Sequence, residues 1–175
     1  MAEALLRRRL SGLGVAARVK SAGLLESGNP ASAEGIDVLA GRGLDMTAHR
    51  SATVSAAILR EADLVLGMAR EHVREAVVVA PELWPRTFTL KELVRRGAAI
   101  GPRKEGESLE AWLSRAHMGR TTASLMGVAP DDDVADPIGQ PRAAYERMVD
   151  ELDGLVDRLV TLAWPAGTER PGGRT

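Results

Sequence analysis

Residues 133–139 read Asp-Val-Ala-Asp-Pro-Ile-Gly and lead directly into the strongest periodic pattern of the chain. From Pro141 onward, apolar side chains recur every three or four positions, which is the spacing of one face of an α-helix. Proline suits a first helical turn because its missing N–H would have no partner there. The sequence therefore predicts a long amphipathic helix, with an apolar face made by Tyr145, Met148, Val149, Leu152, Leu155, Val156, Leu159 and Leu162.

Helical and extended patterns alternate along the preceding part of the chain. Helices are predicted over 2–13, from Ser32 to about Leu39, from Ser51 or Thr53 through Leu59, over 70–80, over Leu90–Val94 and from Ser108 through Ala116. Strands are predicted over Val15–Lys20, Leu64–Leu66 and Thr87–Thr89, and residues 97–131 form a longer connection around the Ser108 helix. This alternation predicts an α/β fold, with helices packed on a short parallel sheet.

The composition of the 175 residues limits the domain organisation and the classes of partner. We expect one domain over 1–163 and a disordered tail over 164–175, which is rich in Pro and Gly. A net charge of -1 gives no reason to expect nucleic acid or an anionic membrane as a partner. No apolar run is long enough to span a membrane, so the expected location is the cytoplasm.

The residues that usually carry metal or redox chemistry are scarce. The chain has no cysteine, which excludes disulfides and thiolate zinc sites. The histidines, His49, His72 and His117, lack the spacing of metal ligands. We therefore expect neither a metal nor a cofactor.

Four segments in order resemble the low-molecular-weight protein-tyrosine phosphatase family, in particular its arginine-phosphatase and arsenate-reductase-like branch. They are Ser21-Ala22-Gly23, His49-Arg50-Ser51, the run Ala-Asp-Leu-Val-Leu-Gly-Met over 62–68, and the 133–139 segment. The resemblance implies a three-layer sandwich around a short parallel sheet. It also implies a central first strand that feeds a Cys-x5-Arg phosphate loop. Residues 1–6 resemble the helix that begins just after that loop, so strand, cysteine and arginine would all lie ahead of Met1.

Asp136 is the main candidate for a catalytic side chain. A residue before proline is restricted to extended backbone, which points its side chain out of the loop. A phosphatase without a metal needs an acid to protonate the departing oxygen. The resemblance implies that Asp136 is this general acid, whereas the plain alternative is a turn before a helix. For Asp133, a structural or electrostatic role is the better expectation.

The resemblance also assigns two residues to the wall of the substrate pocket. Leu25 occupies a loop where several family members place an aromatic ring, and Ile138 follows the Asp-Pro pair where an aromatic is also common. Aliphatic walls weaken the case for phosphotyrosine, and they suit phosphoarginine or an aliphatic phosphomonoester. An ordinary loop role for Leu25 stays open, and a structural hydrogen bond is the expected role of His49. The implied partner is a phosphorylated protein or a small phosphomonoester.

The missing cysteine leaves three hypotheses for the function of the chain. In the first, the start of the given sequence has been placed too late. The complete protein is then a phosphomonoester hydrolase with a phosphocysteine intermediate. In the second, the protein is a catalytically dead binding or regulatory module. In the third, it is a decaying fragment. As given, the chain is expected to be inactive because Asp136 can assist a leaving group but cannot attack phosphorus.

Overall fold

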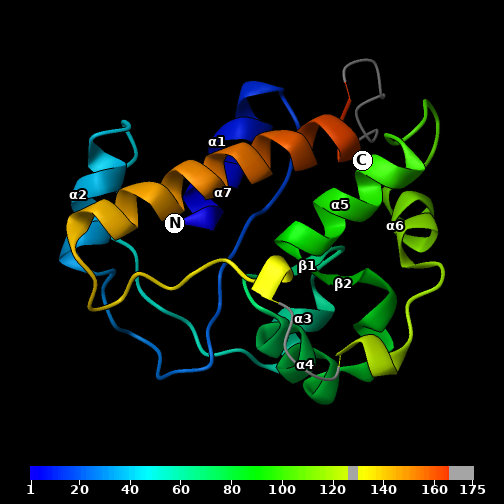
Figure 1. Cartoon of the computed structure of the whole chain (residues 1–175), viewed down its shortest axis with the longest axis horizontal. Coiled ribbons are helices and arrows are strands. Elements are labelled where there is room, and N and C mark those ends of the chain that lie inside the picture. The colour runs from blue at the N-terminus through cyan, green and yellow to red at the C-terminus, as the bar shows by residue number, and fades with distance from the viewer. Residues whose placement is uncertain (126–129, 166–175) are drawn as a thin grey trace, which may run out of the picture.

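The computed structural model describes residues 1–125 and 130–165, and its centre is a parallel pair of short strands (Figure 1). Strand β1 (Val65–Gly67) pairs with β2 (Thr87–Thr89), in a register that sets Leu66 opposite Phe88. The neighbours Val65 and Leu66 pack against two different apolar clusters. Successive side chains of a strand point to opposite faces. The sheet therefore lies between two layers of helices, as predicted.

The larger layer is built around the last helix, α7 (Arg142–Ala163). It packs against α1 (Ala2–Gly12), α2 (Ala33–Ala40) and α5 (Leu90–Ile100), and α6 (Leu109–His117) packs on α5. Figure 1 shows α7 running along one side of the molecule, with α1 crossing behind it and α5 below it. The predicted apolar face of α7 is confirmed, since Tyr145, Val149 and Leu159 are among its fully buried residues.

The smaller layer lies on the other side of the strands. It contains α3 (Ala56–Arg60), α4 (Arg70–Val79) and the 3-10 helix η1 (Pro81–Arg86). Its cluster consists of Leu59, Ala76, Ala80 and Leu83. Two short 3-10 helices, η2 (Thr122–Leu125) and η3 (Pro130–Asp132), lie between α6 and α7 in the sequence.

Hydroxyl side chains fix where several of these helices begin. Ser32, Thr89 and Ser108 each accept a hydrogen bond from a backbone N–H in the first turn of α2, α5 and α6. Such caps satisfy N–H groups that have no partner within the helix. The predicted caps at Ser32 and Ser108 are therefore confirmed.

Two predicted helix boundaries were wrong. Helix α3 begins after Ser55, which caps it, rather than after Ser51 or Thr53. Helix α5 continues to Ile100, well past the predicted end at Val94. Gly97 lies inside the helix, and its lack of a side chain makes room for Trp112 of α6, since a Cβ there would lie 2.9 Å from the Trp112 ring.

The strand predicted over Val15–Lys20 was also wrong. These residues join neither β1 nor β2, and the nearest backbone pairing along this segment is an isolated parallel bridge between Gly23 and Thr53. A strand exists only through hydrogen bonds to a neighbour, and alternation in sequence does not supply one. Instead, the carbonyl of Val19 accepts a hydrogen bond from Arg7, at 3.0 Å.

Two further expectations concern the C-terminal tail and membrane-spanning segments. The proposed tail over 164–175 lies almost wholly outside the described residues, so its disorder stays a prediction. Within the described residues, no helix is long and apolar enough to cross a membrane.

Candidate functional site

Asp136 lies on an exposed segment between η3 and α7. Its Oδ1 accepts a hydrogen bond from the backbone N–H of Ile138 at 3.0 Å, and the N–H of Gln140 donates to the carbonyl of Pro137 at 2.8 Å. Gly139 follows with φ 77°, a conformation that glycine adopts without strain. The buried Pro137 holds the turn against the protein, and the carboxylate of Asp136 faces outward.

A hollow of about 440 Å³ lies between this segment and the first turns of α7. Asp136 borders it together with Arg147 and Glu151, and the remaining walls are Ala135, Pro137, Gln140, Ala144 and Met148. The hollow therefore combines one acid on a tight turn with a cation and a second acid on a helix.

Backbone and side-chain hydrogen bonds attach the Asp136 segment to the sheet and to α5. The N–H of Val134 donates to the carbonyl of Met68 at 2.8 Å, directly after β1. Asp133 accepts a bond from the N–H of Arg70 at 2.7 Å through its carboxylate, and another from Lys91 Nζ at 2.6 Å through its carbonyl. Asp133 thus fixes the position of the segment, which agrees with its predicted structural role.

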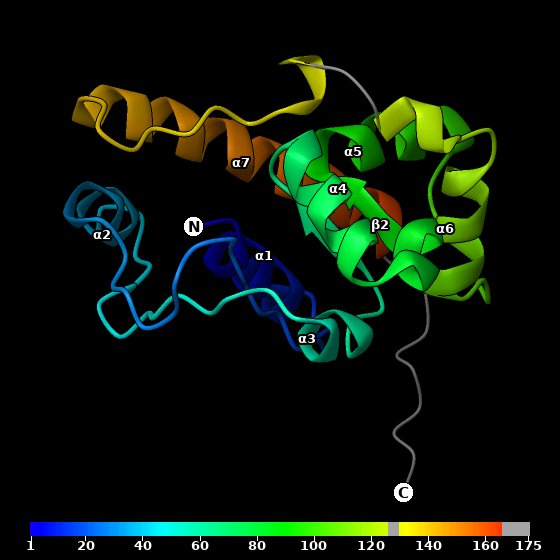
Figure 2. The same ribbon diagram turned by 90° about the horizontal axis from the view of Figure 1, so that it is seen from below.

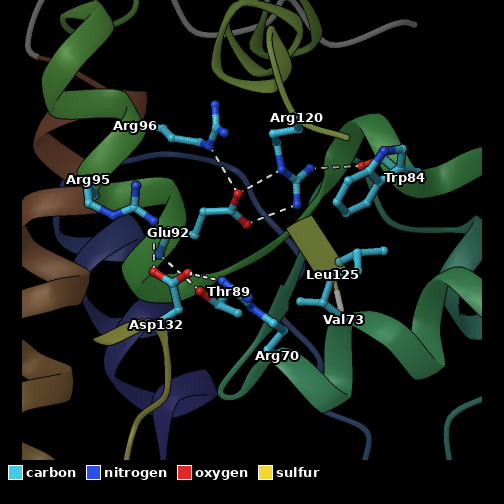
Figure 3. Close-up of a pocket in the computed structure, with 10 residues that line it drawn as sticks. All are labelled: Arg70, Val73, Trp84, Thr89, Glu92, Arg95, Arg96, Arg120, Leu125 and Asp132. Carbon is cyan, nitrogen blue, oxygen red and sulfur yellow. Dashed lines mark hydrogen bonds and ion pairs between the residues drawn. The ribbon is translucent and has the colours of Figure 1, made fainter. Parts of the chain in front are cut away.

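Asp132 reinforces the attachment with two ion pairs (Figure 3). Its buried carboxylate accepts from Arg70 of α4 at 2.8 Å and from Arg95 of α5 at 2.9 Å. Burial raises the pKa of Asp132, but hydrogen bonds and positive charge from Arg95 and Arg70 outweigh it, so the pKa lies below its ordinary value. The acid at 132 is ionised in the fold and joins two helices to the base of the Asp136 segment.

Glu92 is a second carboxylate that pairs with two arginines, and it lies beside Asp132. Glu92 accepts from Arg120 through both of its oxygens, at 2.8 and 2.9 Å, and from Arg96 at 3.0 Å. The guanidinium of Arg120 also lies 3.6 Å from the ring centroid of Trp84 and 4.0 Å from that of Phe88. Cation–π contact and the paired carboxylate compensate a buried cation for its lost water.

The two predicted pocket-wall residues lie apart from the hollow. Leu25 and Ile138 are 80% and 71% exposed, and neither borders the hollow at Asp136. Hydrogen bonds from Ser51 Oγ to the carbonyl of Glu26 and from Thr53 Oγ1 to that of Leu25 hold the Leu25 loop. Figure 2 shows this loop and the Asp136 segment on opposite sides of α2, with the N-terminus between them in that view. The wall assignment stays a prediction.

Polar groups gather at the first turn of α1. Glu3 accepts a hydrogen bond from Ser21 and pairs with Arg7, and His49 Nδ1 lies 4.0 Å from its carboxylate. Burial lowers the pKa of the Met1 ammonium group, and the charge of Glu3 opposes this shift. His49 therefore lies near the Glu3 carboxylate, beyond hydrogen-bonding distance of it.

The bulky aromatics are used elsewhere in the structure. Trp112 is fully buried and donates to the carbonyl of Gly101 at 3.0 Å, Phe88 is fully buried, and Trp84 stacks on Arg120. None of the three borders the hollow at Asp136.

The bridged carboxylates were absent from the sequence predictions. A local signal exists only for Glu92 and Arg96, which lie one helical turn apart. The pairs Asp132–Arg70 and Glu92–Arg120 join residues far apart in the sequence, so no spacing rule could indicate them.

The amino-acid sequence is similar to those of known phosphatases. Residues 1–100 match the family model of the low molecular weight phosphotyrosine protein phosphatases. The chain is 32% identical to the protein-arginine-phosphatase of Geobacillus stearothermophilus over 161 residues, 91% of this chain and 83% of that protein. It is 33% identical over 112 residues to the low molecular weight protein-tyrosine-phosphatase Etp of Escherichia coli K12, 62% of this chain and 72% of that protein.

Solved structures agree with the sequence matches. The low molecular weight protein tyrosine phosphatase from T. tengcongensis superposes with a TM-score of 0.67 at 32% identity, covering 91% of this chain and 86% of that chain. The predicted fold class is thereby confirmed.

We expect Asp132→Asn to lower the free energy of unfolding at neutral pH by about 1.5–3 kcal/mol, the usual worth of hydrogen bonds to charged groups. The folded pKa of Asp132 is depressed, so its contribution is complete above the unfolded pKa of about 3.9 and is lost as the pH falls through the folded value. Urea unfolding of both proteins should show a difference that shrinks below about pH 4.

A matched control is Asp150→Asn, which breaks the more exposed pair with Arg42. It should change the free energy of unfolding by less than about 0.5 kcal/mol. A difference between wild type and Asp132→Asn that does not vary with pH would contradict the ionised state assigned to Asp132.

Proposed function

The chain belongs to the low molecular weight phosphotyrosine protein phosphatase family, and from that premise we propose that it is the body of a phosphomonoester hydrolase with Asp136 as its general acid. The observation that carries the proposal is the Asp136 segment itself. An exposed carboxylate sits on a tight turn, beside a hollow of about 440 Å³. Contacts of Asp132, Asp133 and Val134 hold the base of this turn.

The proposed reaction needs a thiolate that the 175 residues do not contain. In the proposed enzyme a cysteine thiolate attacks phosphorus, and the bond from phosphorus to the leaving atom breaks. The leaving atom is the ester oxygen of a phosphomonoester or the guanidinium nitrogen of phosphoarginine. Asp136 gives its proton to that atom, because an alkoxide or a deprotonated guanidine leaves poorly. Water, deprotonated by the Asp136 carboxylate, then cleaves the phosphocysteine and releases phosphate.

The phosphate loop has its own tasks in this scheme. Backbone N–H groups at a helix N-terminus, together with an arginine, neutralise the phosphoryl oxygens and stabilise the thiolate. Asp136 cannot replace either function, so we propose that the 175-residue chain alone is inactive. A second proposal follows from the same missing cysteine: a protein that keeps the family's acid segment without a thiol serves as a binding or regulatory module.

The proposed substrate class is a phosphorylated protein or a small phosphomonoester, with phosphoarginine favoured over phosphotyrosine. Two observations support this order. Leu25 and Ile138 are aliphatic where an aromatic wall is expected, and the large aromatic rings Trp84, Phe88 and Trp112 are used in other contacts. The long match to a protein named for arginine phosphatase activity points the same way. We also propose a cytoplasmic location.

The 175-residue chain should not hydrolyse p-nitrophenyl phosphate above background, because it has no thiol to form the phosphoenzyme. The measurement is release of p-nitrophenol by purified protein whose helical circular dichroism has been checked. Turnover that survives alkylation of contaminating thiols and disappears in Asp136→Ala would mean that the site has another nucleophile.

Joining a segment of roughly 15 residues, a strand followed by a Cys-x5-Arg loop, ahead of Met1 should confer turnover. In that protein Asp136→Ala should lower kcat by about 10²–10⁴ for a poor leaving group, the usual worth of a general acid. The loss should become small for a leaving group that needs no proton. Asp157→Ala, an exposed acid on α7, is the control and should leave kcat unchanged.

A similar loss of kcat for good and poor leaving groups would contradict proton donation. Asp136 would then act by shaping the turn through its hydrogen bond to the N–H of Ile138.

The extended protein should show only a mild preference among phosphotyrosine, phosphoarginine and aliphatic phosphomonoesters. Aromatic stacking contributes about 0.5–1.5 kcal/mol beyond burial, so each aliphatic replacement corresponds to roughly a two- to tenfold loss in kcat/KM. Leu25→Tyr and Ile138→Tyr should each raise kcat/KM for phosphotyrosine by a similar factor. A preference for phosphotyrosine of about a thousandfold in the unsubstituted protein would show that other residues form the wall.

A further inference from the structure

Glu92 and Asp132, the two carboxylates that are paired with arginines, line a small cavity that plays no part in the proposed reaction (Figure 3). Its volume is about 90 Å³, well above the roughly 10–15 Å³ that one water molecule needs. Thr89, Val73 and Leu125 contribute to its walls. It shares no lining residue with the hollow at Asp136, so the two sites are separate.

The cavity is lined by more positive than negative charge. Four arginines line it, Arg70, Arg95, Arg96 and Arg120, against the two carboxylates of Glu92 and Asp132. Four positive charges minus two negative charges leave a net charge of +2 on the walls. A partly enclosed site strengthens electrostatic attraction, because fewer waters screen it. An anion is therefore the complementary occupant.

The arginines differ in how many donors remain for a ligand. Arg120 uses all of its N–H groups, on Glu92, on the carbonyls of Trp84 and Thr87 and beside His117. The other three keep donors. Among the hydrogen bonds of the described residues, none uses Nε or Nη1 of Arg70, Nε or Nη1 of Arg95, or Nη2 of Arg96.

The two carboxylates hold these guanidinium groups in place while using only some of their donors. Asp132 binds Arg70 and Arg95 through a single nitrogen of each, and Arg96 is held by Glu92 and by the carbonyls of Ala116 and Met118. Little side-chain entropy is then lost when a ligand binds, which favours affinity. In Figure 3, Arg95 and Arg96 reach the cavity from α5 on one side, and Arg70 reaches it from α4 on the other.

We propose that this cavity is a binding site for a tetrahedral oxyanion, with inorganic phosphate as the ligand. The oxygens of phosphate accept charge-assisted hydrogen bonds from Arg70, Arg95 and Arg96, for which guanidinium geometry is well suited. The dianion cancels the net charge of +2 on the walls. Chloride matches the charge poorly and offers no directed acceptors, so the site should distinguish phosphate from simple salt.

The test is calorimetric titration of the 175-residue chain with inorganic phosphate near pH 7.5, at an ionic strength held constant with sodium chloride. Arg95 is the residue to change, because its side chain is 63% exposed and Asp132 keeps Arg70 when Arg95 is lost. Arg95→Gln should weaken phosphate binding by about tenfold, the worth of one charge-assisted hydrogen bond, and Arg95→Glu should abolish measurable binding.

The matched control is Arg142→Gln, which removes an arginine of similar exposure, 58%, with one carboxylate partner. It should leave the dissociation constant within about twofold, since Arg142 does not line the cavity and can act there only through screened charge. Sulfate should bind with an affinity close to that of phosphate. The protein that carries the added N-terminal segment and a Cys→Ser change in its loop should show one further phosphate site at most, and the Arg95 effect should persist.

Two results would overturn the proposal: no saturable binding of phosphate to a protein with intact circular dichroism, or equal weakening by Arg95→Gln and Arg142→Gln. Titration with phosphotyrosine and phosphoarginine separates the two sources of the anion. Tighter binding of these compounds than of phosphate would assign the cavity to a phosphorylated side chain. Equal or weaker binding assigns it to free phosphate.

Discussion

The apolar face of α7 is the constraint on which the rest of the structure depends. The described sheet has only two strands of three residues each, too small to be stable alone. Helix α7 provides what the sheet cannot, because its 22 residues contact α1, α2 and α5 along one buried face. Each large apolar side chain buried there contributes about 1.5–3 kcal/mol. The segment with Asp136 runs directly into this helix, so the best-packed element of the fold also fixes the downstream end of the candidate site.

The upstream end of the same segment is fixed by charge. Asp132, buried between Arg70 and Arg95, brings α4 and α5 to the base of the segment, and Asp133 and Val134 add hydrogen bonds to the end of β1 and to the helices that follow. A buried ion pair adds little net stability, because desolvation offsets most of the attraction. The ion pair is more important for fixing position, because a carboxylate held between two guanidinium groups has few alternative positions. The packing of α7 fixes the downstream end of the segment, and the ion pairs of Asp132 fix its upstream end. The carboxylate of Asp136 stays exposed on the turn between them.

Local pattern and turn chemistry predicted much of the fold. The spacing from Tyr145 to Leu162, the caps at Ser32 and Ser108 and the short strand around Val65 all reflect interactions within a few residues, which one sequence contains. The failures involve distant partners. Val15–Lys20 alternates like a strand but pairs with neither β1 nor β2. The helix predicted over Leu90–Val94 continues to Ile100, and Gly97 within it leaves room for Trp112 of α6. For the candidate site, the motif predicted Asp136, which lies beside a hollow, and the roles of Asp136 and Leu25 stay predictions. The bridges from Asp132 to Arg70 and from Glu92 to Arg120 form only after the chain has folded.

The proposed general acid at Asp136 would supply only part of the rate acceleration that a phosphatase needs. A well-placed general acid accelerates a reaction by about 10²–10⁴, whereas enzymes reach 10⁶-fold or more, and hydrolysis of phosphate monoesters demands far more than that. The remaining factor must come from a nucleophile and from groups that neutralise the phosphoryl oxygens. Electrostatic stabilisation of this kind is usually the largest single contribution to catalysis. The structure does hold preformed cations, but Arg70, Arg95 and Arg96 surround a cavity that shares no wall with Asp136. The arginines proposed to bind phosphate and the acid proposed to protonate a leaving group are therefore divided between two sites. Phosphoryl transfer at Asp136 requires a cysteine and an arginine brought to its own hollow.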